Sequence, residues 1–159
     1  MNKNKDVRGS RTVSAREKAL DILLYRMRSE KELYDKLIEK GYPEEECADA
    51  VEYAKHFGYV NDAEYARQYV YSRGISKGRL LLKKELREKG IGDELIEAAL
   101  EELPESHEVL LSLLEKKYGE PHELDEKEFR RAYSFLLRKG FNNSSVITAL
   151  KEYRLGGES

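Results

Sequence analysis

Lysine and arginine side chains gather in one part of this chain. Residues 65–91 contain eight of them against two acidic residues, whereas the 159-residue chain as a whole has a formal net charge of -2. Within that segment Arg79, Lys83 and Arg87 recur at every fourth position, which places them along one side of a helix. Tyrosines lie just upstream, and cations beside aromatic rings are typical of surfaces that bind single-stranded nucleic acid or its phosphate backbone. The residue types therefore suggest anion binding.

The same pattern has a second interpretation, which the sequence leaves open. Rows of lysine and arginine on amphipathic helices are commonly solvated faces, and Glu85 and Glu88 stand beside these cations as partners. Likewise, Arg26 and Arg73 stand near the ends of predicted helices, where an arginine can cap the last carbonyl groups instead of contacting a ligand.

No pattern in the sequence indicates catalysis or metal binding. The segment 74–79, GISKGR, lacks the Gly-Lys-Ser/Thr step of a phosphate-binding loop. The three histidines have no metal-ligand spacing to one another or to Cys47. Cys47 takes the place of Ile96 and Val146 in an internal repeat, so we expect it to be a small buried hydrophobic residue. We expect no catalytic residues, no metal and no cofactor.

The elements that carry the cations are internally repeated. Segments 36–51, 85–100 and 135–150 align without gaps, at offsets of 49 and 50 residues. Each contains a helix that ends in Lys-Gly, then an apolar residue, then a short helix with apolar positions at i, i+3 and i+4. The lysine suits the negative end of the helix dipole, and the glycine supplies the left-handed residue that follows a helix.

Another helix is predicted before each Lys-Gly helix, over 15–27, 62–73 and 106–118. The sequence therefore predicts an all-α protein with nine helices, in three tandem three-helix repeats stacked into an elongated, curved array. Four helix starts have a capping residue followed three positions later by Glu, in the segments SARE, SEKE, NDAE and DEKE that begin at Ser14, Ser29, Asn61 and Asp125. The expected divisions are an N-terminal arm at 1–14, repeats at 15–57, 58–103 and 104–155, and a tail at 156–159.

The repeats also relate the basic residues to one another. Arg26 and Arg28 occupy the first inter-helix turn of the first repeat, near the position that Arg73 takes in the second. The third repeat contributes Arg130, Arg131 and Arg138. A recurring arginine suggests one continuous ligand followed along the array. The residues that we predict to bind it are Arg26, Arg28, Arg73, Lys77, Arg79, Lys83, Lys84 and Arg87.

Composition limits the class of protein. Residues 93–128 hold thirteen acidic residues against three lysines, so the charge asymmetry predicts one basic and one acidic surface. The acidic last helices of the first two repeats argue against reading of duplex DNA by a helix-turn-helix. One cysteine suits a reducing compartment, and no apolar run or hydrophobic leader indicates membrane insertion or export. We expect a cytoplasmic monomer with no membrane partner.

Two segments, RMRSEKELYDKLIEKGY and FGYVNDAEYARQYVYSRGISKGRLLLKKELREKGI, make the chain similar to a known family. Together they resemble the RecX family, the bacterial modulators of the RecA recombinase. The resemblance covers about residues 15–155 and is strongest over 56–100. Ile75 and Ser76 depart from the family pattern, in which this spacing is often more basic or contains proline. The matched positions include Arg26, Arg28, Ser29, Gly41, Tyr65, Arg73, Gly78, Arg79, Glu85 and Gly90.

The resemblance implies a non-enzymatic regulator of homologous recombination and DNA repair. Its partners would be the RecA filament and single-stranded DNA, contacted through the basic residues, and its effect would be inhibition of ATP hydrolysis and strand exchange. The residues alone leave another possibility, a helical-repeat adaptor that binds a protein through its charged faces and contacts neither a recombinase nor DNA.

Overall fold

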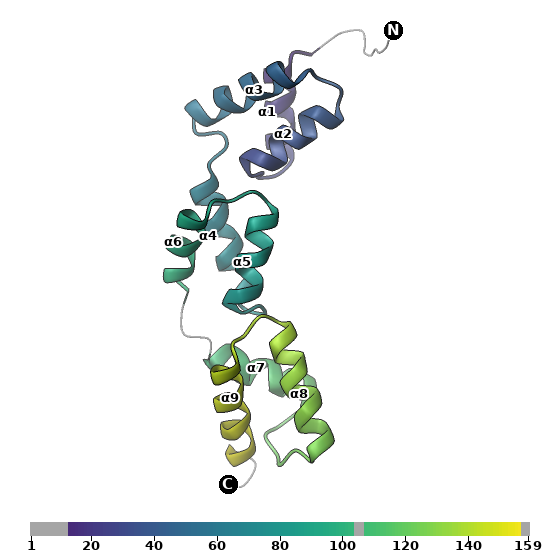
Figure 1. Ribbon diagram of the computed structural model, residues 1–159, viewed down its shortest axis with the longest axis vertical. Helices are drawn as coiled ribbons and strands as arrows, with labels where there is room; N and C mark the ends of the chain where they lie inside the picture. The colour runs from purple at the N-terminus through teal and green to yellow at the C-terminus, as the bar shows by residue number, and fades with distance from the viewer. Residues whose placement is uncertain (1–12, 104–106, 157–159) are drawn as a thin grey trace. The chain divides into compact units, whose positions relative to one another are not determined.

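The computed structural model describes residues 13–103 and 107–156. Across these two ranges it has nine α-helices and no strand, in the order expected of three successive three-helix repeats (Figure 1). The all-α fold class predicted from the sequence is therefore confirmed. The expected arm falls almost wholly on residues 1–12 and the tail on 157–159, which lie outside the described residues.

The polypeptide divides into two compact units. Unit 1 comprises Met1–Tyr65 and the turn Lys89–Ile91, and unit 2 comprises Ala66–Glu88 and Gly92–Ser159. The division passes through α4 (Asp62–Arg73). The remaining helices are α1 (Ala15–Tyr25), α2 (Glu30–Glu39), α3 (Glu44–His56), α5 (Arg79–Glu88), α6 (Asp93–Glu101), α7 (His107–Tyr118), α8 (Glu126–Arg138) and α9 (Asn143–Gly156).

Helix starts follow the capping residues of the sequence. Ser14, Ser29 and Asp125 each accept a hydrogen bond from the backbone amide three residues later, and the side chain of the glutamate there accepts one from the amide of the capping residue. At Asn61 the side-chain oxygen accepts from the Glu64 amide at 3.0 Å. Each cap satisfies amide groups that have no partner inside the helix, which fixes where the helix begins. All four predicted N-termini are confirmed.

The core of unit 1 lies between α1, α2 and α3. It contains Ala19, Leu33 and Leu37, and α3 presents Cys47 and Ala50 to them, all fully buried. Cys47 is therefore the small buried residue that the repeat alignment predicted. Its burial, and then the nearby carboxylates of Glu46 and Glu44, raise the pKa of the thiol.

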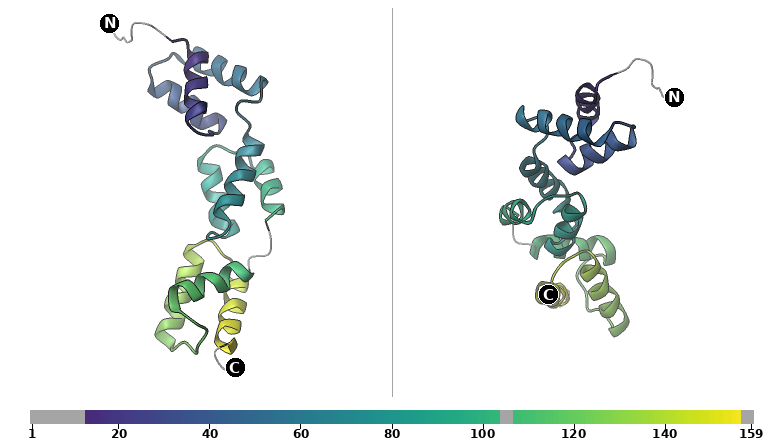
Figure 2. Two further views of the ribbon diagram at one scale, coloured as in Figure 1. Left: turned by 180° about the vertical axis from the view of Figure 1, so that it is seen from behind. Right: turned by 45° about the horizontal axis from the view of Figure 1, so that its top comes forward.

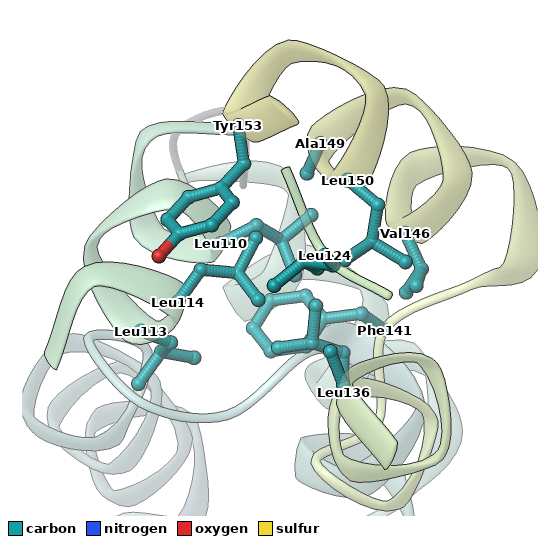
Figure 3. Packing of buried hydrophobic residues seen from close by; sticks show 11 residues of the cluster. Leu110, Leu113, Leu114, Leu124, Leu136, Phe141, Val146, Ala149, Leu150 and Tyr153 are labelled. Carbon is teal, nitrogen blue, oxygen red and sulfur yellow. The ribbon is translucent and has the colours of Figure 1, made fainter. Parts of the chain in front are cut away.

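In unit 2, α9 packs against both α7 and α8 around a core of leucines (Figure 3). Leu114 and Leu136 face α9, whose Val146 and Leu150 are buried against them. Tyr153 is also buried, and its hydroxyl donates to the carbonyl oxygen of Gly119 at 2.8 Å. A buried tyrosine needs such a partner, so this bond fixes the turn after α7 against α9. The side-chain cluster consists of Leu110, Leu113, Leu114, Leu124, Ala132, Leu136, Phe141, Val146, Ala149, Leu150 and Tyr153.

The other part of unit 2 carries the basic residues of α5, here called the α5 stripe: Arg79, Lys83, Lys84 and Arg87. Leu82 and Leu86 of α5 are fully buried, as are Ile96 and, almost completely, Leu100 of α6. One face of α5 is thereby committed to the interior. Other positions of α5, including Arg79, Lys84 and Arg87, are exposed on the outside of the helix.

Candidate functional site

The eight predicted binding residues divide between the two units. Arg26 and Arg28 belong to unit 1, and the other six lie in unit 2 on α4, on α5 and in the turn between them.

Four of the six cations in unit 2 have a carboxylate partner. The Lys77 ammonium lies 2.8 Å from both carboxylate oxygens of Glu85. Lys83 lies 2.6 Å from Glu97 of α6, and Lys84 lies 3.7 Å from Glu88 one turn along α5. Arg87 makes a two-pronged contact with Asp93, at 2.9 and 3.2 Å.

These pairs differ in how firmly the protein holds them. Glu85 is mostly buried and also accepts a 2.6 Å hydrogen bond from the Tyr69 hydroxyl. Burial raises its pKa, but the bonds from Lys77 and Tyr69 and the positive charge of Lys77 outweigh that effect, so the pKa lies below its usual value. Arg87 and Asp93 are both more than half exposed, and such a pair is readily exchanged for another anion.

Arg73 and Arg79 have no carboxylate partner within 4.0 Å among the residues that the structure describes. The Arg73 guanidinium lies 4.3 Å from the centre of the Tyr69 ring and donates to the Ser72 hydroxyl at 3.2 Å. Arg79 donates to the carbonyl oxygen of Leu103 at 3.3 Å. Both arginines are exposed, so both guanidinium groups are available to an anion.

A hollow of about 260 Å³ lies beside Arg79 in unit 2. Arg79 and Lys77 line it, together with the exposed apolar side chains of Tyr71 and Ile75 and the backbone of Gly74. Tyr65 and Tyr69 are buried, whereas Tyr71 is 83% exposed, so one of the three tyrosines singled out in the sequence is at the surface. The site thus combines cations with an exposed aromatic ring.

In unit 1 the two predicted arginines differ in their contacts. Arg26 follows α1 as its C-cap and donates to the Met27 carbonyl at 3.1 Å. Burial, and then the neighbouring carboxylate of Glu32, raise the pKa of Tyr65 to about 12, and Arg26 opposes that shift. Arg28 is half-buried, and its Nε is the one buried side-chain nitrogen or oxygen without a hydrogen-bond partner in the described ranges. The backbone amide of Arg26 donates to the Ile22 carbonyl of α1, whereas its guanidinium contacts Met27, which lies beyond that helix.

The sequence-based set omitted a second basic site, in the third repeat. Lys117 of α7 and four basic residues of α8 line a hollow of about 630 Å³. The left view of Figure 2 shows α7, in green, crossing α8. The helical spacing of Lys127, Arg131 and Arg138 was a signal for it. The abundance of acidic residues over 93–128 obscured that signal, because charge summed along the sequence does not separate the faces of a helix.

Among the described residues, no helix is long and apolar enough to cross a membrane, and no three histidine, cysteine or acidic side chains are grouped so that they could hold a metal ion.

The architecture defines the chain as a protein of tandem three-helix repeats. Sequence models of the three RecX domains match in order: the first three-helix domain at residues 15–53, the second at 61–100 and the third at 105–150. The chain belongs to the RecX family.

Curated relatives and solved structures agree with this assignment. The chain is 37% identical over 147 residues to the regulatory protein RecX of Bacillus pumilus, covering 89% of this chain and 56% of that protein. It is 36% identical to the regulatory protein RecX of Amycolatopsis mediterranei, covering 87% and 82%. The crystal structure of RecX from Lactobacillus salivarius superposes with a TM-score of 0.73 at 28% identity, covering 87% of this chain and 94% of that one. Against the Bacillus relatives, the matched region spans little more than half of their length.

Proposed function

We propose that this protein binds the filament that the RecA recombinase forms on single-stranded DNA, and that it lowers the ATP hydrolysis and strand exchange of that filament without catalysing a reaction itself. The relatives are named regulatory proteins, which agrees with a role exerted on another macromolecule. The observation that carries the proposal is the row of cations on the outer side of α5, which begins with Arg79, together with Arg73 at the end of α4.

The contacts of these cations suit exchange with an external polyanion. Surface ion pairs such as Lys84–Glu88 and Arg87–Asp93 contribute about 0–1 kcal/mol, so an anion that offers several charges at once can replace the carboxylates. Arg73 and Arg79 need no such exchange. The Lys77–Glu85 pair is mostly buried and is held by Tyr69, so we assign it to the structure of the site instead of to ligand contact.

The test is the single-stranded-DNA-dependent ATPase rate of the host recombinase with this protein titrated in. We expect the rate to fall, and a fall at substoichiometric amounts would favour action at filament ends over one-to-one coating of the groove. The double variant Arg79→Glu with Lys83→Glu should lose the effect while keeping its helical circular dichroism.

A matched control is the double variant Lys151→Glu with Arg154→Glu on α9, which changes the charge equally at two exposed positions outside the site. It should inhibit as the wild type does. Equal inhibition by the α5 variant would remove the stripe from the mechanism. If the folded wild-type protein does not inhibit the recombinase at several-fold excess, the proposed regulatory role is contradicted, and an adaptor for another protein is favoured.

A further inference from the structure

The hollow between α7 and α8 is lined by five cations and no acidic residue. Lys127, Arg130, Arg131 and Arg138 project from α8, and Lys117 comes from the last turn of α7. The four α8 positions follow one another at spacings of three, one and seven residues, so they share one side of the helix over about 17 Å. The other lining residues are Tyr118, Ser134 and Phe135.

These cations lack the partners that the α5 stripe has. Arg130 lies 4.0 Å from Glu126, with both side chains more than two-thirds exposed. No carboxylate oxygen of the described chain lies within 4.0 Å of the other four, whereas Lys77, Lys83, Lys84 and Arg87 each have one. The acidic third repeat therefore carries the more strongly uncompensated basic surface.

Stability of the fold does not account for this arrangement. Lys127 and Arg131 are four residues apart on the same side of α8, a spacing at which like charges destabilise a helix. Neither Glu126 nor Glu128, the acidic residues in the first turn of α8, lines the hollow. An anionic ligand is what would compensate the repulsion.

The residues that line the hollow indicate which kind of anion it can bind. The Lys117 ammonium lies 4.2 Å from the centre of the half-buried Phe135 ring, and this contact holds one positive charge in the lining of the hollow. Three of the other cations are arginines, whose planar forks match the oxygens of a phosphate. Cations combined with aromatic surface are the composition of grooves that follow the backbone of single-stranded nucleic acid.

We propose that the hollow between α7 and α8, named the α7–α8 groove, binds the phosphate backbone of single-stranded DNA independently of the DNA sequence. The proposal rests on the function proposed above, since it supplies the DNA contact of a protein that acts on a DNA-bound filament. It places that contact in the third repeat and leaves the largely paired α5 stripe for contacts with protein.

The experiment measures binding of a fluorescein-labelled thirty-nucleotide oligothymidylate to the full chain by anisotropy, without recombinase and at low salt. The double variant Arg131→Glu with Arg138→Glu should raise the Kd by at least about ten-fold, because affinity for the backbone comes from such contacts. The neutral variant Arg131→Gln with Arg138→Gln should lower the slope of log K against log salt by about 1.4, that is, about 0.7 for each lost contact.

The control is again Lys151→Glu with Arg154→Glu, which makes the same charge change in the same repeat and should leave the Kd within about two-fold of wild type. Far-UV circular dichroism verifies that each variant is folded. An equal loss of affinity in the groove variant and in the control variant would show that binding depends on net charge alone, and would overturn the site. So would wild-type protein that fails to bind the oligonucleotide, or that binds oligoglutamate of equal charge as tightly.

The ATPase assay separates this inference from the function on which it rests. A groove variant that binds DNA normally, in a protein that inhibits the recombinase, would overturn the groove and leave the regulator standing. Loss of DNA binding by the groove variant, in a protein without effect on the recombinase, would support the groove and contradict the regulator.

Discussion

The hydroxyl of Ser29 donates a 2.7 Å hydrogen bond to the backbone carbonyl of Lys89, sixty residues further along the chain. Unit 2 contains the same relationship, because the amide of Gly78 donates to the carbonyl of Lys139 at 2.7 Å. Ser29 and Gly78 align at the 49-residue offset of the repeat, and both lysines belong to Lys-Gly turns. The Lys-Gly turn therefore does more than end a helix: it also contacts the start of an earlier one.

The third repeat differs from the first two at the position that makes this contact. The residue that aligns with Ser29 and Gly78 is Glu128, and it lies inside α8, which begins two residues earlier. At the other end, the Lys40–Gly41 turn of the first repeat has no neighbour near Gly41.

Replacement of Ser29 by alanine should destabilise unit 1 by about 2 kcal/mol. The change removes the helix cap on Glu32, which contributes about 1 kcal/mol, and the bond to Lys89, which contributes about 1 kcal/mol more. Urea unfolding followed by circular dichroism measures the loss. Ser14→Ala is the control, because Ser14 caps α1 with the same pair of bonds but is exposed, so about 1 kcal/mol should be lost. Equal losses in the two variants would contradict a stabilising role for the Ser29–Lys89 bond.

Alanine at Gly140 should cost much more stability than alanine at Gly41. Both glycines have a left-handed backbone, with φ of 94° and 99°, so each substitution carries a strain of about 1–2 kcal/mol. A Cβ at Gly140 would also lie 2.4 Å from the Cβ of Leu81 and 2.5 Å from its amide nitrogen, whereas nothing lies within 4 Å at Gly41. Thermal unfolding of both variants gives the comparison. A similar fall in Tm would show that the turn and α5 can separate without cost.

The sequence was sufficient to predict the helices, because their signals are local. Capping residues and apolar spacing at Ser14, Ser29 and Asp125 act within one or two turns, and the observed starts follow them. The contact of Lys89 with Ser29 could not be predicted in the same way. It joins residues sixty positions apart, and its donor is a side chain in one repeat and a backbone amide in the other, so the alignment shows no common residue type.

The candidate site was predicted less completely, for a related reason. The spacing of Arg79, Lys83 and Arg87 correctly indicated one side of α5, but it could not show that Lys83 pairs with Glu97 of another helix. In the same way, the count of acidic residues around α8 gave no information on which of them approach Arg131. Charge compensation depends on tertiary neighbours, whereas helix formation depends mainly on sequence neighbours.

The Glu85 carboxylate should make the stability of unit 2 depend on pH. Its pKa is lowered in the folded protein, so its contribution is complete above the ordinary value of 4.5 and is lost as the pH falls through the folded pKa. The difference in free energy of unfolding between wild type and Glu85→Gln should therefore be larger at pH 7 than at pH 3. Urea titrations at the two pH values measure it. Glu88→Gln is the control, because its exposed carboxylate lies 3.7 Å from Lys84 and should contribute little at either pH. A difference independent of pH would contradict a charged Glu85 bonded to Lys77 and Tyr69.

Cys47 should report the opening of unit 1. It is the single cysteine of the chain, it is fully buried, and its raised thiol pKa reduces the reactive thiolate, so labelling by a disulfide reagent should require local unfolding. Leu33→Ala removes a fully buried side chain from the same core and should cost about 2–5 kcal/mol, which predicts labelling faster by about 30-fold or more. Leu136→Ala makes the same deletion in the core of the third repeat and is the control. The absorbance of the released thiol gives both rates. Fast labelling of the wild-type protein, or equal acceleration by the two variants, would show that the thiol is reached by a route other than opening of the α1–α3 core.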